Sequence, residues 1–239
     1  MSMASRTNEA ALEQAIERAL TGTTCEQLRA VHANANIAEA AVHYRAGKQY
    51  HIGDPADFDM DHAMDRRRFW DFLESTQADE LAKLKNDPQY ELKVIQRLDR
   101  LITKNGVIHL LKNGLQVDDA HFHLFYVAPL ASSSASVKEN FEKNQYSVTR
   151  QVRYNREKPL QEIDMVIFIN GLPMVTVELK NAWTHQTARN QGIKQYKKDR
   201  DHTQPLLKFG RCVVHMAVDT EEVYMCTRLQ GDSSYFLPF

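Results

Sequence analysis

Two carboxylates and a lysine occupy matching positions in two apolar stretches that flank an Asn-Gly pair. The segment Ile163–Lys180 predicts a β-hairpin, because runs rich in β-branched residues surround Asn170-Gly171, a strong short-range turn signal. Asp164 and Glu178 each lie seven positions from Gly171, so the two strands place them opposite each other. Lys180 lies two residues beyond Glu178 and therefore on the same face. The three charged groups are expected to converge at the open end of the hairpin.

This convergence predicts a metal site. Carboxylates placed directly across a strand pair repel each other, and each resists burial without compensation. A divalent cation supplies that compensation, and hard oxygen ligands suit Mg²⁺ or Mn²⁺. The Lys180 ammonium then lies where it can orient an attacking water or offset the charge of a phosphorane. The alternative interpretation is a sheet end whose charged side chains reach into solvent.

The composition is that of a protein with a sizeable core. The chain has 239 residues, of which 43% are hydrophobic, and this length fits one large domain or two small ones. Its formal net charge of −1 argues against broad electrostatic wrapping of DNA but leaves local basic patches open. Three cysteines without metal spacing predict reduced thiols. Reduced thiols predict a cytoplasmic location, and we find no transmembrane run and no secretory signal in the sequence.

Hydrophobic patterning predicts helices in the first part of the chain and a sheet in the last part. Helices are expected at Thr7–Leu20, within Asp57–Lys85 and at Tyr90–Thr103, with a weak helix at Ile37–Val42. Val107–Lys112 and Ala120–Ala128 alternate like strands. The elements expected after residue 145 are Tyr146–Tyr154, Ile163–Ile169, Met174–Lys180, a helix at Gln186–Arg200, then Val213–Val218 and Val223–Thr227. This αβββαβ order predicts an α/β sandwich.

The helix expected after the hairpin is the most basic in the chain. Its cations include Lys194, Lys197, Lys198 and Arg200. Because this helix follows the predicted metal hairpin directly, the three lysines are candidates for contacts with a phosphate backbone. A solvated helix face is the alternative interpretation.

The arrangement of Asp followed by Glu-x-Lys on paired strands resembles the metal site of the PD-(D/E)xK nucleases. Over essentially its whole length, the chain is similar to the N-terminal nuclease region of the restriction (R) subunit of type I restriction-modification enzymes. The segments that carry this resemblance are Asn8–Glu13, Phe69–Leu84, Ile163–Asn181, Gln195–Arg200, Met225–Leu229 and Phe236–Phe239. Ile163–Asn181 is the core signature, and it is specific in combination with the tail.

The resemblance implies a restriction-endonuclease-like fold, in which an αβββαβ core with a mixed sheet is flanked by helices and carries a helical N-terminal elaboration. We expect one nuclease domain over residues 1–239, with a mainly helical part to about 144, a catalytic core over about 145–228 and a linker over 229–239. In the resembled subunits the linker leads to an ATP-dependent DNA translocase motor and then to a helical domain that docks on the methyltransferase core. The chain is therefore expected to be an excised domain or a truncated product.

The resemblance also assigns roles to residues of the hairpin. It implies that Asp164, Glu178 and the backbone carbonyl of Leu179 bind the metal, and that Lys180 is the catalytic lysine. The implied ion is Mg²⁺, for which Mn²⁺ would substitute. ATP would act only through the absent motor.

Supporting residues are implied on two helices. Glu13, with Glu9 as the alternative, matches an acid of the first helix that assists the site in related nucleases. RecB-like relatives carry Gln-x-x-x-Tyr on the helix after the hairpin, whereas Gln191 and Tyr196 are five residues apart here. On a regular helix this spacing separates them by about 140°, compared with about 40° for a spacing of four. A local bulge would bring both toward the site; otherwise one of them contributes.

The implied function is metal-dependent hydrolysis of phosphodiester bonds in double-stranded DNA without base specificity of its own, as the endonuclease of a type I site-specific deoxyribonuclease. Such enzymes serve host defence in the cytoplasm of bacteria or archaea. The expected partners are double-stranded DNA and, through the full-length subunit, the methyltransferase and specificity subunits, with no membrane. Two alternatives stay open: a docking module that couples translocation to cutting with little nuclease activity, or a stand-alone RecB-like repair nuclease.

Overall fold

The structure is a computed structural model that describes residues 3–34, 50–181 and 187–239. The α-helices are α1 (Met3–Thr21), α2 (Cys25–Asn34), α3 (Arg66–Thr76), α4 (Ala78–Leu84), α5 (Tyr90–Asn105), α6 (Val107–Asn113) and α7 (Ala135–Glu142). The strands are β1 (His51–Ile52), β2 (Phe58–Asp59), β3 (Met64–Asp65), β4 (Leu115–Val117), β5 (Ala120–Phe122), β6 (Tyr146–Arg153), β7 (Glu162–Ile169), β8 (Leu172–Leu179), β9 (Val214–Val218), β10 (Val223–Cys226) and β11 (Leu237–Pro238). Two π-helical turns lie at Ala188–Gly192 and Gln195–Asp199, and 3₁₀ turns lie at Pro55–Asp57 and Pro205–Leu207.

A mixed seven-stranded sheet forms the centre of the fold, in the order β1-β6-β7-β8-β9-β10-β11. Strands β6, β7 and β8 are antiparallel neighbours, whereas β9 runs parallel to β8. A parallel pair needs a crossover connection, and the segment containing Ala188–Asp199 supplies it. The predicted α/β class and αβββαβ order are confirmed, with α1 as the first helix. The tail, where a linker is expected, contributes β11 to the edge of the sheet.

The β7–β8 hairpin closes at the predicted Asn-Gly turn. Ile169 pairs with Leu172 across Asn170-Gly171, whose φ angles are 50° and 79°. Positive φ at both central residues is the requirement of the type I′ turn, which Asn-Gly favours. The Asn170 amide also donates to the carbonyl oxygen of Leu124 at 3.0 Å, so the turn is fixed from outside the hairpin.

The pairing of the hairpin agrees with the predicted register at its open end. A β-bulge between Ile167 and Phe168 shifts the pairing by one residue near the turn. Farther from the turn, Met165 pairs with Val177, which is the predicted register. The next positions outward are Asp164 and Glu178, and they therefore lie opposite each other.

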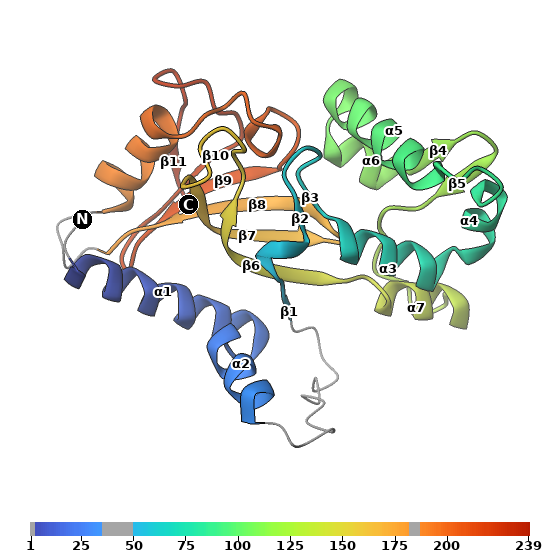
Figure 1. The fold of residues 1–239 in the computed structure, drawn as a ribbon, viewed down its shortest axis with the longest axis horizontal. Helices are drawn as coiled ribbons and strands as arrows, with labels where there is room; N and C mark the ends of the chain where they lie inside the picture. Colours follow the sequence, from blue (N-terminus) through green and yellow to red (C-terminus); the bar gives the residue numbers. More distant parts are fainter. Residues whose placement is uncertain (1–2, 35–49, 182–186) are drawn as a thin grey trace.

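Helices cover both faces of the sheet. On one face, α1 packs Leu12, Ile16 and Leu20 against strand residues Val148, Met165, Val177 and Leu179. On the other face, the helical segment after β8 buries Tyr196 among side chains that include Val166 and Phe168. The two layers are visible in Figure 1, where α1 and the orange helical segment lie on opposite sides of the strands.

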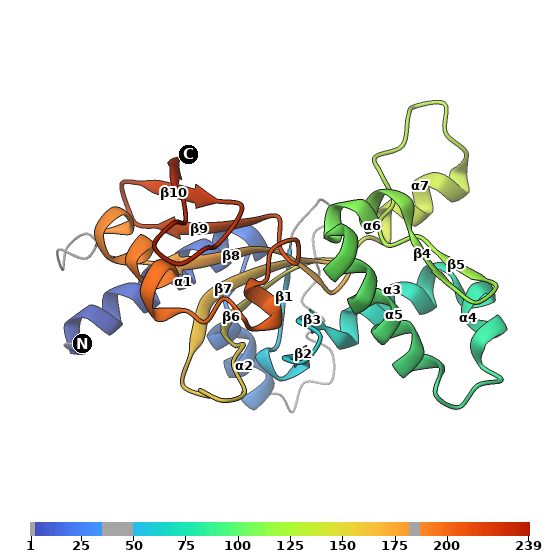
Figure 2. The same cartoon turned by 90° about the horizontal axis from the view of Figure 1, so that it is seen from above.

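A helical lobe, which we define as α3–α6 with β4 and β5, lies at the turn end of the hairpin. Figures 1 and 2 show it beside the sheet, on the side away from the N-terminus. It has its own core, which includes Phe69, Phe72 and Leu98, and the hairpin residues Leu172 and Met174 belong to the same cluster. The closed end of the hairpin is thus buried in the lobe, whereas its open end lies outside it.

Two of the predicted strands are wrong or too long. Val107–Lys112 is not a strand but the body of helix α6, which begins after Gly106 and ends before Gly114. Both glycines have positive φ and bound the helix, and its buried residues Val107 and Leu110 are spaced as on a helix face. Of Ala120–Ala128, only Ala120–Phe122 is a strand. The weak helix predicted at Ile37–Val42 lies outside the described residues.

Substitution of Gly171 by alanine is expected to destabilise the protein by about 3 kcal/mol, because positive-φ strain and a steric clash add together. A Cβ at this position would lie 2.4 Å from the carbonyl oxygen of Asp65 and 2.7 Å from the backbone nitrogen of Phe69. Urea unfolding measures the loss. Gly231→Ala is the matched control, because Gly231 also has positive φ but its Cβ would lie 3.8 Å from the nearest atom. Equal losses for the two variants would contradict the clash.

Among the described residues, none of the helices has the length and apolar character needed to cross a membrane. The three cysteines, Cys25, Cys212 and Cys226, are free, as predicted.

Candidate metal-dependent nuclease site

An open cleft of about 660 Å³ lies at the open end of the hairpin. Residues from α1, β6, β7 and the helical segment after β8 surround it, together with Lys180, which follows β8 directly. The residues that line it are Glu9, Ala10, Glu13, Arg150, Gln151, Leu160, Glu162, Asp164, Lys180, Gln195 and Arg200. The predicted residues Asp164, Lys180, Glu13 and Glu9 are therefore brought together from segments far apart in the sequence.

Asp164 and Glu178 differ in their access to the cleft. The Asp164 side chain keeps 19% of its surface exposed, whereas Glu178 is completely buried. The backbone N–H of Leu179 donates to Asp164 Oδ2 at 2.7 Å, which fixes that carboxylate across the strand pair. Asp164 thus faces the cleft directly, and Glu178 lies behind its surface.

Glu178 is held by an arginine that the sequence did not single out for the site. Arg200 Nε donates to Glu178 Oε1 at 2.7 Å, and Arg200 Nη2 donates to Oε2 at 2.8 Å. This two-point pairing of a guanidinium with a carboxylate is among the strongest charged hydrogen bonds in proteins. It explains how a completely buried carboxylate is tolerated next to Asp164 in this structure.

Lys180 is a buried ammonium among carboxylates. Its side chain is 1% exposed, and its Nζ donates to the backbone carbonyl of Leu179 at 2.7 Å. The same Nζ lies 3.8 Å from Glu9 Oε1 and 3.9 Å from Asp164 Oδ2. Gly192 allows the helical segment to approach, because a Cβ there would lie 3.5 Å from Lys180 Cγ and 2.9 Å from the Ala217 side chain. The lysine is therefore fixed at the carboxylates, as the hairpin pattern predicts.

Two acids of α1 reach the cleft. Glu13 accepts hydrogen bonds from Arg150 Nε at 3.0 Å and from Gln151 Nε2 at 2.6 Å. Glu9 lies one helical turn earlier, and its Oε1 is buried without a hydrogen-bond donor in the described part of the chain. The structure thus places both alternatives for the first-helix acid at the same cleft.

The carboxyl groups of the cleft resist ionisation. Burial, with a further contribution from the Asp164 carboxylate, raises the pKa of Glu13 to about 7 and that of Glu178 to about 7. Burial also raises the pKa of Asp164 and of Glu9, although the Lys180 ammonium opposes the increase. The pKa is thus raised at four neighbouring carboxyls, chiefly because burial disfavours their charged forms.

Comparison with protein families identifies the chain at this point. The family described as type I restriction enzyme R protein N terminus matches residues 61–234, which include the hairpin, Lys180 and Arg200. The chain belongs to this family. The fold, a mixed sheet of seven strands between helices, is compatible with the restriction-endonuclease-like fold. Comparison with curated proteins gave no match. The match begins after α1 and does not cover Glu9 and Glu13, which the structure places at the cleft.

The raised pKa of Glu13 predicts how stability of this R protein N terminus depends on pH. In the folded state the Glu13 pKa is about 7, against an ordinary value of 4.5, so the folded chain binds more protons between these values. Stability from this group is complete below about pH 4.5 and is lost as pH rises through about 7. In EDTA, the melting temperature is expected to fall between pH 5.5 and pH 8, because Glu13 releases about one proton from the folded chain over this range. Thermal melts of Glu13→Gln should show a shallower fall, and an unchanged slope would contradict the assignment.

The helical segment after β8 presents different polar residues to the cleft from those that regular helical spacing predicts. Its two π-helical turns, Ala188–Gly192 and Gln195–Asp199, are the kind of bulge that the five-residue spacing required. Tyr196, however, is completely buried, and its hydroxyl lies 2.8 Å from Thr176 Oγ1. Gln195 lines the cleft, whereas Gln191 is not among the described residues that line it. Gln195 and Arg200 are thus site residues that spacing rules for a regular helix do not find.

The lysines predicted to contact DNA lie away from the cleft lining. Lys198 Nζ pairs with Asp232 Oδ2 at 2.7 Å, and Lys197 Nζ donates to the Asp232 carbonyl at 3.3 Å. Lys194 is exposed. Two of the three lysines therefore hold the C-terminal segment against the helix in this structure.

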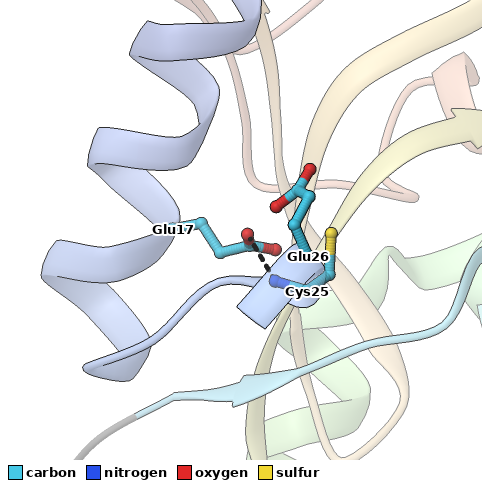
Figure 3. A group of neighbouring side chains, drawn as sticks. All are labelled: Glu17, Cys25 and Glu26. Atoms are coloured by element: carbon cyan, nitrogen blue, oxygen red, sulfur yellow. Dashed lines mark hydrogen bonds between the residues drawn. The ribbon is translucent and has the colours of Figure 1, made fainter. Parts of the chain in front are cut away.

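A second acidic cluster lies beside the cleft but is already neutralised. Ligand atoms of Glu17, Cys25 and Glu26 all lie within 4.8 Å of one another (Figure 3), a spacing that the cleft acids do not share among the described residues. Arg150 Nη1 donates to Glu17 Oε2 at 3.1 Å and to Glu26 Oε1 at 2.9 Å. Burial and the Glu17 carboxylate raise the pKa of the Cys25 thiol to about 11, so it stays protonated. This cluster fastens α1 and α2 to β6 through Arg150 and thereby positions Glu13.

Proposed function

We propose that this chain is the metal-dependent endonuclease domain of a type I restriction R subunit and hydrolyses phosphodiester bonds of double-stranded DNA without reading bases. The observation that carries the proposal is the cleft at the open end of the hairpin, which Asp164 and Lys180 line and behind whose surface Glu178 is buried, in a chain of this family. The methyltransferase and specificity subunits are proposed as partners through the full-length subunit.

The residues present fit a divalent cation. Glu9 Oε1 and Gln195 Oε1 are buried acceptors without a donor among the described residues, and both side chains line the cleft. The Lys180 ammonium lies 3.8 Å from Glu9 Oε1, too far for a hydrogen bond, so both oxygens can still accept a bond from an ion or an ion-bound water. Burial raises the pKa of the neighbouring carboxyls, a cost that a bound cation would offset. Oxygen ligands of this kind favour Mg²⁺ or Mn²⁺ over softer metals.

In the proposed mechanism, Asp164, Glu178 and the Leu179 carbonyl would hold the ion. When bound, such an ion lowers the pKa of a coordinated water and neutralises charge on the phosphate. Lys180 acts from a fixed position, because its ammonium is buried and hydrogen-bonded to Leu179 O. A preorganised cation at this point stabilises negative charge as it develops on the phosphate. Glu13 holds Gln151 and Arg150 at the wall of the cleft through its two oxygens.

Plasmid cleavage tests the proposed function. Supercoiled plasmid is incubated with the chain in Mg²⁺, in Mn²⁺ and in EDTA, beside Asp164→Asn. Nicking that requires metal and is lost in the variant supports a self-sufficient nuclease with its site on the hairpin. No cutting by either protein, in any metal, would contradict the activity for the isolated chain. Equal cutting by both would place the site elsewhere.

The helical lobe favours a second role beside catalysis. The lobe contributes no side chain to the cleft lining among the described residues, although it has a core of its own. A docking module that couples a motor to the nuclease would use such a lobe. If the chain fails to cut plasmid but binds a purified methyltransferase complex in a pull-down, and loses that binding when the lobe surface is substituted, the docking function is the better description.

A further inference from the structure

The Glu178–Arg200 pair occupies the carboxylate on which the proposed metal site depends. Both oxygens of Glu178 accept from the guanidinium, at 2.7 and 2.8 Å, and the carboxylate has no solvent exposure. A divalent cation that approached this carboxylate would also approach the guanidinium, and like charges at such distances repel strongly outside bulk water. The ion and Arg200 therefore compete for Glu178.

Without an ion, Glu178 needs this arginine. A buried carboxylate beside a second one, Asp164, carries a large desolvation cost unless a cation compensates it. Lys180 does not fill the role, because its Nζ is hydrogen-bonded to Leu179 O and lies near Glu9 and Asp164. Arg200 is thus the cation that pairs with Glu178 and fixes its orientation before metal arrives.

The Arg200 side chain can enter the cleft when it is displaced from Glu178. It follows the π-helical turn Gln195–Asp199 with an extended backbone, φ −92° and ψ 136°, and so its side chain leaves from the end of the helix. The residue lines the same open cleft as Asp164 and Lys180. Within the described residues, the hydrogen bonds of its side chain go to Glu178. Release from Glu178 therefore leaves a guanidinium in the cleft, where an anionic phosphodiester would enter.

We propose that Arg200 is a positioning residue that holds Glu178 until a divalent metal ion replaces it, so that metal binding requires an exchange of counter-ions at this carboxylate. This inference rests on the proposed function, because it assumes that the cleft takes a metal. The exchange predicts that Arg200 lowers the metal affinity of the protein without DNA, while it keeps the Glu178 carboxylate in place.

Metal affinity without DNA tests the exchange. Mn²⁺ binding to the chain is measured by the electron paramagnetic resonance signal of free Mn²⁺, for wild type, Arg200→Gln and Arg200→Lys. We expect Arg200→Gln to bind Mn²⁺ about tenfold more tightly than wild type, because the competing charge is gone. Arg200→Lys retains the charge but loses the two-point grip, so we expect an intermediate affinity. Arg156→Gln is the matched control, because Arg156 pairs with Asp61 on the surface at 2.8 Å, and it should bind as wild type does.

Thermal melts supply the second readout. In EDTA, Arg200→Gln should melt below wild type, and saturating Mn²⁺ should restore more of its melting temperature than it adds to wild type. A residue that only supported the fold would weaken Mn²⁺ binding when removed. Unchanged or weaker Mn²⁺ affinity in both Arg200 variants would overturn the exchange.

Asp164→Asn separates failure of the exchange from failure of the proposed function. If Asp164→Asn abolishes Mn²⁺ binding in the wild-type and Arg200→Gln backgrounds, the metal is in the cleft, and the Arg200 variants alone decide the exchange. If wild type and Arg200→Gln both bind no Mn²⁺, or if binding survives Asp164→Asn, then the metal site is wrong and the exchange falls with it.

Discussion

Glu178→Gln is expected to lower metal-dependent plasmid cleavage by about 10²–10³-fold or more, because it removes a charged ligand from the proposed metal site without changing side-chain shape. The amide oxygen can still accept one hydrogen bond from Arg200, so the fold should persist. The rate of supercoiled plasmid loss in Mg²⁺ measures the effect, with circular dichroism as the check on folding. Glu91→Gln is the control, because Glu91 also pairs with an arginine, Arg66 at 3.1 Å, but on the exposed surface of the helical lobe.

An alanine at position 178 is expected to affect stability as well as cleavage. Glu178→Ala leaves the Arg200 guanidinium buried without its carboxylate, and breaking a buried pair in this way costs about 3–5 kcal/mol. Loss of cleavage in Glu178→Ala alone would therefore mix chemistry with unfolding. The double variant Glu178→Gln with Arg200→Gln removes both charges together and should be more stable than Glu178→Ala. Cleavage near the wild-type rate in a folded Glu178→Gln protein would contradict the assignment of Glu178 as a ligand.

Lys180→Met is expected to reduce cleavage by about 10²–10³-fold while leaving metal affinity equal to or higher than that of wild type. The ammonium is buried and touches Leu179 O, with carboxylate oxygens 3.8 and 3.9 Å away, so it stabilises charge from a fixed position. Methionine fills a similar volume, but it removes the positive charge that repels an incoming cation. Single-turnover cleavage and Mn²⁺ titration, carried out on the same preparation, separate the two effects.

A surface lysine provides the comparison for this variant. Lys83 pairs with Glu80 at 2.6 Å on α4, within the helical lobe, so Lys83→Met should cleave at the wild-type rate. If Lys180→Met instead lost Mn²⁺ binding and cleavage together, the lysine would be maintaining the geometry of the ligands and would have no separate role in the chemistry.

The hairpin and its three charged residues could be predicted because they depend on local sequence. Alternation fixes which side chains share a face, and Asn170-Gly171 fixes where the strands turn, so the placement of Asp164 opposite Glu178 follows from counting. The β-bulge at Ile167 was not predictable, but it lies on the turn side of the pairs that set the register at the open end.

What the sequence missed depends on contacts between distant segments. Arg200 and Glu178 are 22 residues apart, and their pairing requires the helical segment to end at Arg200 after a π-helical turn. Gln195 lines the cleft for the same reason, since regular helical spacing does not describe that segment. The sequence predicts a strand where helix α6 lies because the short run Val107–Lys112 fits both periods. The positive φ values at Gly106 and Gly114 show where the helix begins and ends.

Because the turn end of the hairpin is buried in the helical lobe, a movement of the lobe would also move the open end of the hairpin. Leu172 and Met174 pack in the core of the lobe, and Asp65, the residue just before α3, donates its N–H to Gly171 O at 2.8 Å. Strands of eight residues are about 26 Å long, so a tilt of the lobe by about 5° moves the far end by about 2 Å. A displacement of about 1 Å can change a catalytic rate by about 10²-fold. A load applied to the lobe would therefore reach Asp164 and Glu178 as a change in alignment, without any contact at the cleft itself.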